Sequence, residues 1–161
     1  MIEKETAINW TEIVTAIIAV YGAALGTYNL IIRLRENRPR IKVRISMGLL
    51  NYGVGGTSEA MIFLEAANAG RTMVTLNVPF FRLPDKQQIV FPNPQRNIVF
   101  PYELLPGKNC QIWVEAREFA RTLLASGYSG TVKLTGLYRN QVGTSYKSKS
   151  YKFNISDWTK S

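Results

Sequence analysis

The chain has 161 residues and a formal net charge of +9, from 20 Lys and Arg against 11 Asp and Glu. Its one cysteine excludes an intrachain disulfide and agrees with a reducing, cytoplasmic setting. It has no histidine, so the commonest general base and the commonest metal ligand are both missing.

An apolar run without a charged residue extends from Ile13 to Ile32. A bilayer core about 30 Å thick needs about 20 apolar residues in a helix, and this run supplies them. Trp10 and Tyr28 lie near its two ends, where aromatic rings favour the membrane interface. We therefore expect one transmembrane helix. The alternative is a buried helix of a soluble oligomer.

The charges that flank this run predict its orientation. Glu3, Glu5 and Glu12 precede it, whereas a strongly basic segment follows it. Because basic flanks stay in the cytoplasm, we expect residues 1–12 outside, residues 13–38 as the span with its basic cytoplasmic end, and residues 39–161 as a cytoplasmic domain at the inner (plasma) membrane. Anionic lipid headgroups are the expected partner of the basic segment, with a nucleotide or nucleic acid as a second interpretation. Its basic residues are Arg33, Arg35, Arg38, Arg40, Lys42 and Arg44.

One side of the predicted helix carries small residues, and Gly22 and Gly26 form a G-x-x-x-G motif. Such a face lets two helix backbones approach closely in lipid, so we expect it to mediate self-association. The alternative is a motif that arose by chance, because Gly and Ala are common in spans. The face comprises Thr15, Ala19, Gly22, Ala23 and Gly26.

Short strands separated by Pro and Gly turns follow the span. Ile41–Met47 alternates strictly between apolar and polar residues, as a half-buried strand does. Asn51–Ser58 is expected to be a flexible loop, and its glycines match no phosphate-binding motif. Apolar residues at helical spacing predict a helix over Ala116–Leu124, ended by Gly127. The other expected strands are Met61–Asn68, Met73–Leu83 with an irregularity at Pro79, Gln88–Phe91, Asn97–Phe100, Cys110–Val114, and a hairpin of Thr131–Tyr138 with Thr144–Ile155.

This spacing predicts a mainly β fold, in which the N-terminal helix precedes an antiparallel β-sandwich of about seven strands with one inserted short helix. Arg38–Val43 reads as an Arg-Pro entry strand, Asn68–Arg71 as an Asn-x-Gly-Arg turn and Gly127–Leu134 as Gly-Tyr-Ser-Gly-Thr-Val-Lys-Leu, while Tyr151–Phe153 is followed by Asp157-Trp158. In these segments the chain resembles a group of short, largely uncharacterised bacterial proteins. The resemblance covers most of the chain. It implies an Ig-like sandwich on a membrane anchor and no known chemistry.

The residues show no constellation for acid–base, metal or phosphoryl-transfer chemistry, so we expect neither a cofactor nor an enzyme. Cys110 opens a predicted strand, and we interpret it as a small buried hydrophobe, because free cysteines are usually buried. Glu115 and Glu118 lie at the start of the predicted helix, where acidic side chains favour its dipole.

Basic and aromatic residues interleave in the C-terminal hairpin, as a nucleotide or a single-stranded nucleic acid would require. Simple alternation places Lys147, Lys149, Tyr151 and Phe153 on one face. Lysines that protect a sheet edge are the preferred interpretation. The candidate anion or nucleotide contacts are Lys133, Arg139, Tyr146, Lys147 and Lys149.

Together these features predict a non-enzymatic interaction module. It would be an adaptor or a subunit of a membrane-associated complex, assembled as a homo-oligomer or with other proteins. The alternative is a ligand-activated oligomeric membrane effector, with a nucleotide as the candidate ligand and phage defence as a setting suggested by analogy of architecture. An enzyme ranks third.

Overall fold

The computed structural model describes residues 10–36, 38–51, 53, 56–91, 94–96 and 98–159. The chain divides into two compact units, Met1–Arg38 and Pro39–Ser161. The acidic residues Glu3 and Glu5 lie outside the described residues, as do parts of the loop predicted over Asn51–Ser58 and the first residue of the strand predicted over Asn97–Phe100.

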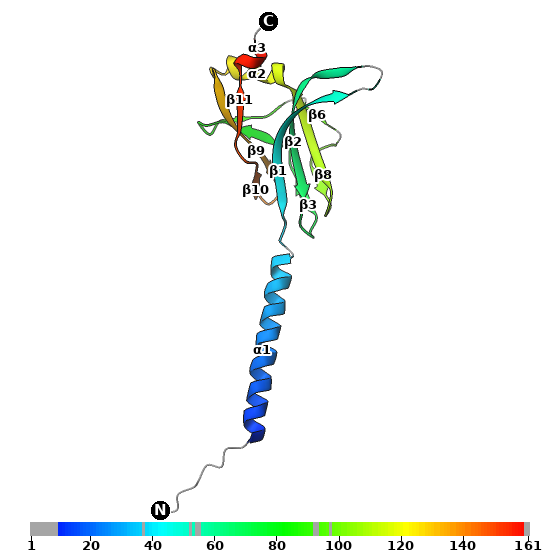
Figure 1. Ribbon diagram of the computed structural model, residues 1–161, viewed down its shortest axis with the longest axis vertical. Helices are drawn as coiled ribbons and strands as arrows, with labels where there is room; N and C mark the ends of the chain where they lie inside the picture. Colours follow the sequence, from blue (N-terminus) through cyan, green and yellow to red (C-terminus); the bar gives the residue numbers. More distant parts are fainter. Residues whose placement is uncertain are drawn as a thin grey trace, which may run out of the picture. The chain divides into compact units, whose positions relative to one another are not determined.

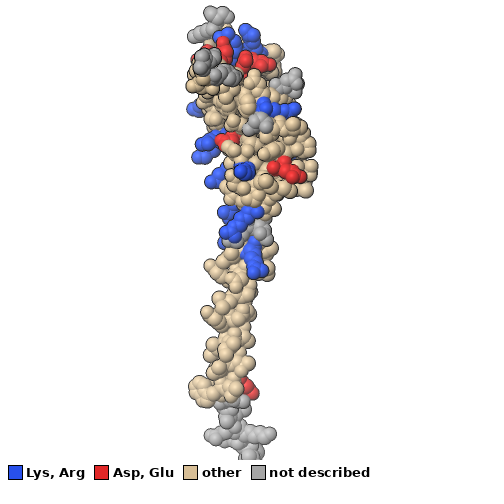
Figure 2. Space-filling model, turned by 90° about the vertical axis from the view of Figure 1, so that its right-hand side faces the viewer, with Lys and Arg blue, Asp and Glu red and all other residues tan. Residues whose placement is uncertain are grey.

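The first unit contains one long helix, α1 (Trp10–Glu36), which confirms the apolar helix expected there. Over Trp10–Arg35 it is long enough, and with a mean hydropathy of 1.6 apolar enough, to cross a membrane. Glu12 lies in its first turn, and Arg33 and Arg35 lie in its last turn. Figure 2 shows the uncharged surface between these two ends. The hydroxyl of Thr15 donates a hydrogen bond to the carbonyl of Thr11 at 2.7 Å, which satisfies this polar group within the helix.

The second unit is built from antiparallel strands in three sheets (Figure 1). The first sheet has the order β1 (Ile41–Asn51), β2 (Thr57–Asn68), β8 (Asn109–Glu115) and β6 (Gln95–Arg96). The second has the order β10 (Ser145–Lys147), β9 (Thr131–Arg139), β4 (Phe80–Arg82) and β5 (Gln88–Ile89), with β11 (Tyr151–Asn154) also paired to β9. The small third sheet pairs β3 (Val74–Leu76) with β7 (Tyr102–Leu104). The helices are α2 (Ala116–Ala125) and α3 (Ser156–Thr159).

The mainly β fold with an inserted helix is therefore confirmed, but several strand boundaries were wrong. The strand expected over Met73–Leu83 is two strands in different sheets, β3 and β4. Pro79 lies between them and has no N–H to donate to a ladder. In place of the strand expected over Asn97–Phe100, Gln95–Arg96 forms β6. Short elements such as β7 and α3 were missed, because three or four residues carry no detectable periodicity.

The two larger sheets face each other as in a β-sandwich and enclose one core. Phe119 and Leu123 of α2 are fully buried in it, as the helical spacing predicted. The sheets approach closely at Gly136 of β9, where a Cβ would lie 2.2 Å from Leu64 Cδ1 of β2 and 3.3 Å from Ile45 Cγ1 of β1. Next to this point, the buried Tyr138 hydroxyl donates a hydrogen bond to the Leu64 carbonyl at 2.9 Å. β9 therefore lies over the β1–β2 pair.

We predict that Gly136→Ala destabilises the domain by about 1–3 kcal/mol, because the added methyl group overlaps Leu64 between two fixed sheets. Chemical denaturation of the purified protein measures this change. Gly48→Ala is the control, since a Cβ there would meet the Phe63 ring at an ordinary 3.4 Å. Equal stability of the two variants would contradict the close packing at Gly136.

Candidate functional site

β1 is an edge strand, and half of its main-chain groups face away from the sheet. The Arg40 carbonyl accepts a hydrogen bond from the Ala69 N–H at 2.8 Å, so Arg40 and the even-numbered residues after it direct their main-chain groups toward β2. Because this direction alternates along an antiparallel strand, Ile41, Val43 and Ile45 direct theirs to the opposite edge. Among the described residues no strand pairs with that edge.

Beyond this edge lies the last strand of the second sheet. β9 lies over β1 and β2, and its partner on the side away from β4 is the segment formed by β10 and β11. β10 lies close to β1, and a cavity of about 780 Å³ opens between residues 41–45 of β1 and residues 147–151 of this segment. We call this cavity the edge cleft. It is lined by Ile41, Lys42, Val43, Arg44, Ile45, Glu65, Ala67, Lys147, Lys149, Ser150 and Tyr151.

A bulge at Ser148 shapes the far wall of the edge cleft. The Ser148 N–H donates to the Gly136 carbonyl, and the Ser148 hydroxyl accepts a bond from the Gly136 N–H, both at 2.9 Å. The pairing register of β9 consequently differs by one residue between β10 and β11, where Lys147 opposes Leu137 but Tyr151 opposes Leu134.

The prediction that Lys147, Lys149, Tyr151 and Phe153 share one face is therefore wrong. Tyr151 and Phe153 lie on the face that packs against the core, and Lys147 lies on the other face. Alternation holds only along an uninterrupted strand, and the bulge adds one residue to it.

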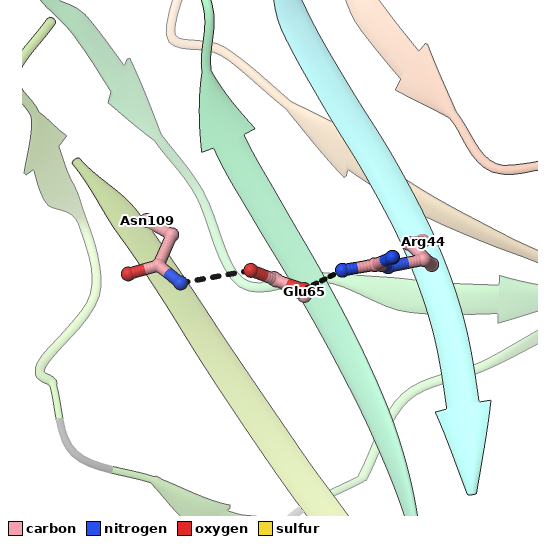
Figure 3. Close-up of polar contacts among 3 residues, drawn as sticks. All are labelled: Arg44, Glu65 and Asn109. Atoms are coloured by element: carbon pink, nitrogen blue, oxygen red, sulfur yellow. Dashed lines mark hydrogen bonds and ion pairs between the residues drawn. The ribbon is translucent and has the colours of Figure 1, made fainter. Parts of the chain in front are cut away.

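The edge cleft is strongly basic. Four of its lining side chains are cationic and one, Glu65, is acidic. Glu65 already accepts a hydrogen bond from Asn109 at 2.8 Å and pairs with Arg44 at 3.3 Å (Figure 3). These contacts run in a row across β8, β2 and β1. The remaining cations Lys42, Lys147 and Lys149 are exposed and carry no partner among the described residues, so the cleft presents a positive field to solvent.

The structure thus joins two groups of residues that the sequence had placed apart. Lys42 and Arg44, expected in the membrane-surface cluster, share the cleft with Lys147 and Lys149, expected as anion contacts. The other members of both groups lie elsewhere: Arg33 and Arg35 belong to α1, Arg38 and Arg40 precede β1, and the cleft is not lined by Lys133, Arg139 or Tyr146.

Of the three hairpin residues outside the cleft, Arg139 and Tyr146 have local contacts, and the Tyr146 hydroxyl accepts a hydrogen bond from Asn140 Nδ2 at 3.5 Å. The guanidinium of Arg139 lies 5.5 Å from the centre of the Phe80 ring and its Nε donates to the Ser145 hydroxyl. Lys133 is directly opposite Lys152, and both are exposed.

Sequence reasoning missed the main-chain groups of β1, since only the tertiary fold shows which strand is at an edge.

On α1, the small-residue face offers room for close approach of a second helix. Neither Gly22 nor Gly26 has an atom of another residue within 4 Å of an added Cβ, apart from its own helix turn and chain neighbours. The face, Thr15, Ala19, Gly22, Ala23 and Gly26, is exposed along its whole length. A large side chain there would not disturb the helix itself.

Cys110, the remaining candidate for a reactive side chain, has a structural position in the core. Cys110 is buried, as expected, and burial raises the pKa of its thiol to about 11, so it holds its proton at neutral pH. Among the described residues, no group of three or more Cys, Asp or Glu could hold a metal ion.

No protein-family model matches the chain, and neither does any curated protein. The resemblance to short bacterial proteins stays a prediction.

Proposed function

We propose that this protein is a membrane-anchored, non-enzymatic binding module, an adaptor or subunit of a membrane-associated complex, that takes an anionic partner in its edge cleft. The supporting observation is the cleft itself. Cations from β1 and from residues 147–149 converge on one cavity, and Glu65, the one carboxylate among its described lining residues, is already paired. A volume of about 780 Å³ is that of an ordinary binding site.

The membrane anchor in this proposal is α1. Ile17, Ile18 and Val20 are each more than 60 % exposed, and a helix with such a surface requires lipid or a protein partner. The basic residues after the span favour a cytoplasmic β domain and contact with anionic headgroups. The resemblance to short bacterial proteins supports the inner membrane as the location.

We predict that a reporter fused after Ser161 is active when it requires the cytoplasm and inactive when it requires export. The reason is the positive-inside rule, applied to Arg33, Arg35 and Arg38. The matched control is the same pair of reporters fused before Met1. Activity of the exported reporter at the C-terminus would reverse the proposed orientation.

A second prediction tests the cleft as the partner site. Tagged full-length protein, purified from its native host in mild detergent, should retain a defined partner, and Lys147→Glu with Lys149→Glu should lose most of it through charge repulsion. Mass spectrometry identifies and quantifies the partner. Lys133→Glu with Lys152→Glu is the control, because it makes the same change in net charge at exposed positions that do not line the cleft. Equal loss in both variants would refute a specific role of the cleft.

A second candidate function is a membrane effector, in which an anion such as a nucleotide binds the domain and drives assembly of the helices, for example in phage defence. The small-residue face of α1 favours it. In this case Gly22→Ile with Gly26→Ile should abolish assembly and any depolarisation of the membrane, whereas Val14→Ile with Val20→Ile should not. Membrane-potential dyes and crosslinking measure both effects. An unchanged membrane potential on activation of the unaltered protein would exclude this function.

A further inference from the structure

The free edge of β1 and the charge of the edge cleft together select one kind of occupant. We infer that the cleft takes an acidic peptide segment in extended conformation, which pairs with β1 as an additional strand. This inference rests on the proposed binding function and names the partner for it. The occupant would extend the first sheet at its β1 edge, within the edge cleft.

Main-chain chemistry supplies the first argument. Ile41, Val43 and Ile45 line the cleft, and each directs an N–H and a carbonyl away from β2. An exposed edge of this kind is a template for strand addition, in which main-chain hydrogen bonds provide affinity. From Ile41 to Ile45 the strand rises about 13 Å, so an added segment of about five residues would pair along it.

The side chains of the cleft supply the second argument. An added strand would alternate in phase with β1, so one set of its side chains would lie beside Lys42 and Arg44. The other set would face inward, toward the half-buried Ile41, Val43 and Tyr151. The fitting sequence therefore alternates acidic and apolar residues.

The same charges exclude a second copy of this strand. If two β1 edges paired with each other, Lys42 and Arg44 of one copy would lie beside cations of the other, and like charges on neighbouring strands are destabilising.

A nucleotide would use the cations but not the main-chain groups of β1. The sequence motifs and described residues provide no glycine-rich phosphate loop beside the cleft.

The experiment uses full-length protein in detergent and a pool of synthetic ten-residue peptides in which Glu or Asp alternates with Val, Ile, Leu or Thr. We expect members of the pool to bind, and peptides with Lys in place of the acids not to bind. Peptide binding should also slow hydrogen exchange at the amides of Ile41, Val43 and Ile45. Fluorescence anisotropy and hydrogen-exchange mass spectrometry provide the two readouts.

Val43→Pro should weaken peptide binding about tenfold, the loss expected for one main-chain hydrogen bond. It removes an N–H that β2 does not use, and proline is tolerated at the outer side of an edge strand. A second measurement leaves the protein unaltered. Peptides N-methylated at alternate residues should lose binding in one frame and retain it in the other, because only one set of peptide N–H groups faces β1.

Two results would overturn the inference while the proposed function stands. One is peptide binding that is lost in Lys147→Glu with Lys149→Glu but is insensitive to Val43→Pro and to the methylation frame. The other is no peptide binding together with binding of ATP or inorganic phosphate that this charge reversal removes. If charge reversal in the cleft changes no binding at all, both the inference and the proposed function fail.

Discussion

The close approach of the two sheets at Gly136 is the constraint on which the rest of the domain depends. With no Cβ at this position, Leu64 of β2 and Ile45 of β1 come directly against the β9 backbone. The Tyr138 hydroxyl fixes the same contact by its bond to the Leu64 carbonyl. This contact places the β9 backbone against side chains of β1 and β2, and β10, the next strand of that sheet, also lies close to β1. The edge cleft lies beside this contact, between β1 and residues 147–151.

The cations of the edge cleft do more than protect a strand edge, because together they create a positive electrostatic field in one cavity. Cationic residues on edge strands discourage pairing between copies of a protein. Here cations of β1 and of residues 147–149 line the same cavity, and Glu65, the one carboxylate among its described lining residues, is engaged by Asn109 and Arg44. In the proposed binding mode, the cations that discourage pairing between copies are the same ones that would attract the acidic partner.

The two units of the chain bear different kinds of unsatisfied surface. α1 exposes apolar side chains, which lipid or another helix can cover. β1 exposes polar main-chain groups, which need water or hydrogen-bonding partners. The proposed anchor and the proposed binding edge have opposite chemical requirements, and in this chain they follow each other directly in the sequence.

By itself the sequence determined the local features of this protein. The long apolar run predicts α1, strict alternation predicts β1, and helical spacing at Phe119 and Leu123 predicts α2, because each pattern repeats over enough residues to be recognised. Only the tertiary structure decided which strand is at an edge, that β3 and β4 belong to different sheets, and that Lys42 and Lys147 line the same cleft. The physical reason is that these facts depend on pairing between distant segments, and a one-residue bulge such as that at Ser148 changes the face of every residue beyond it.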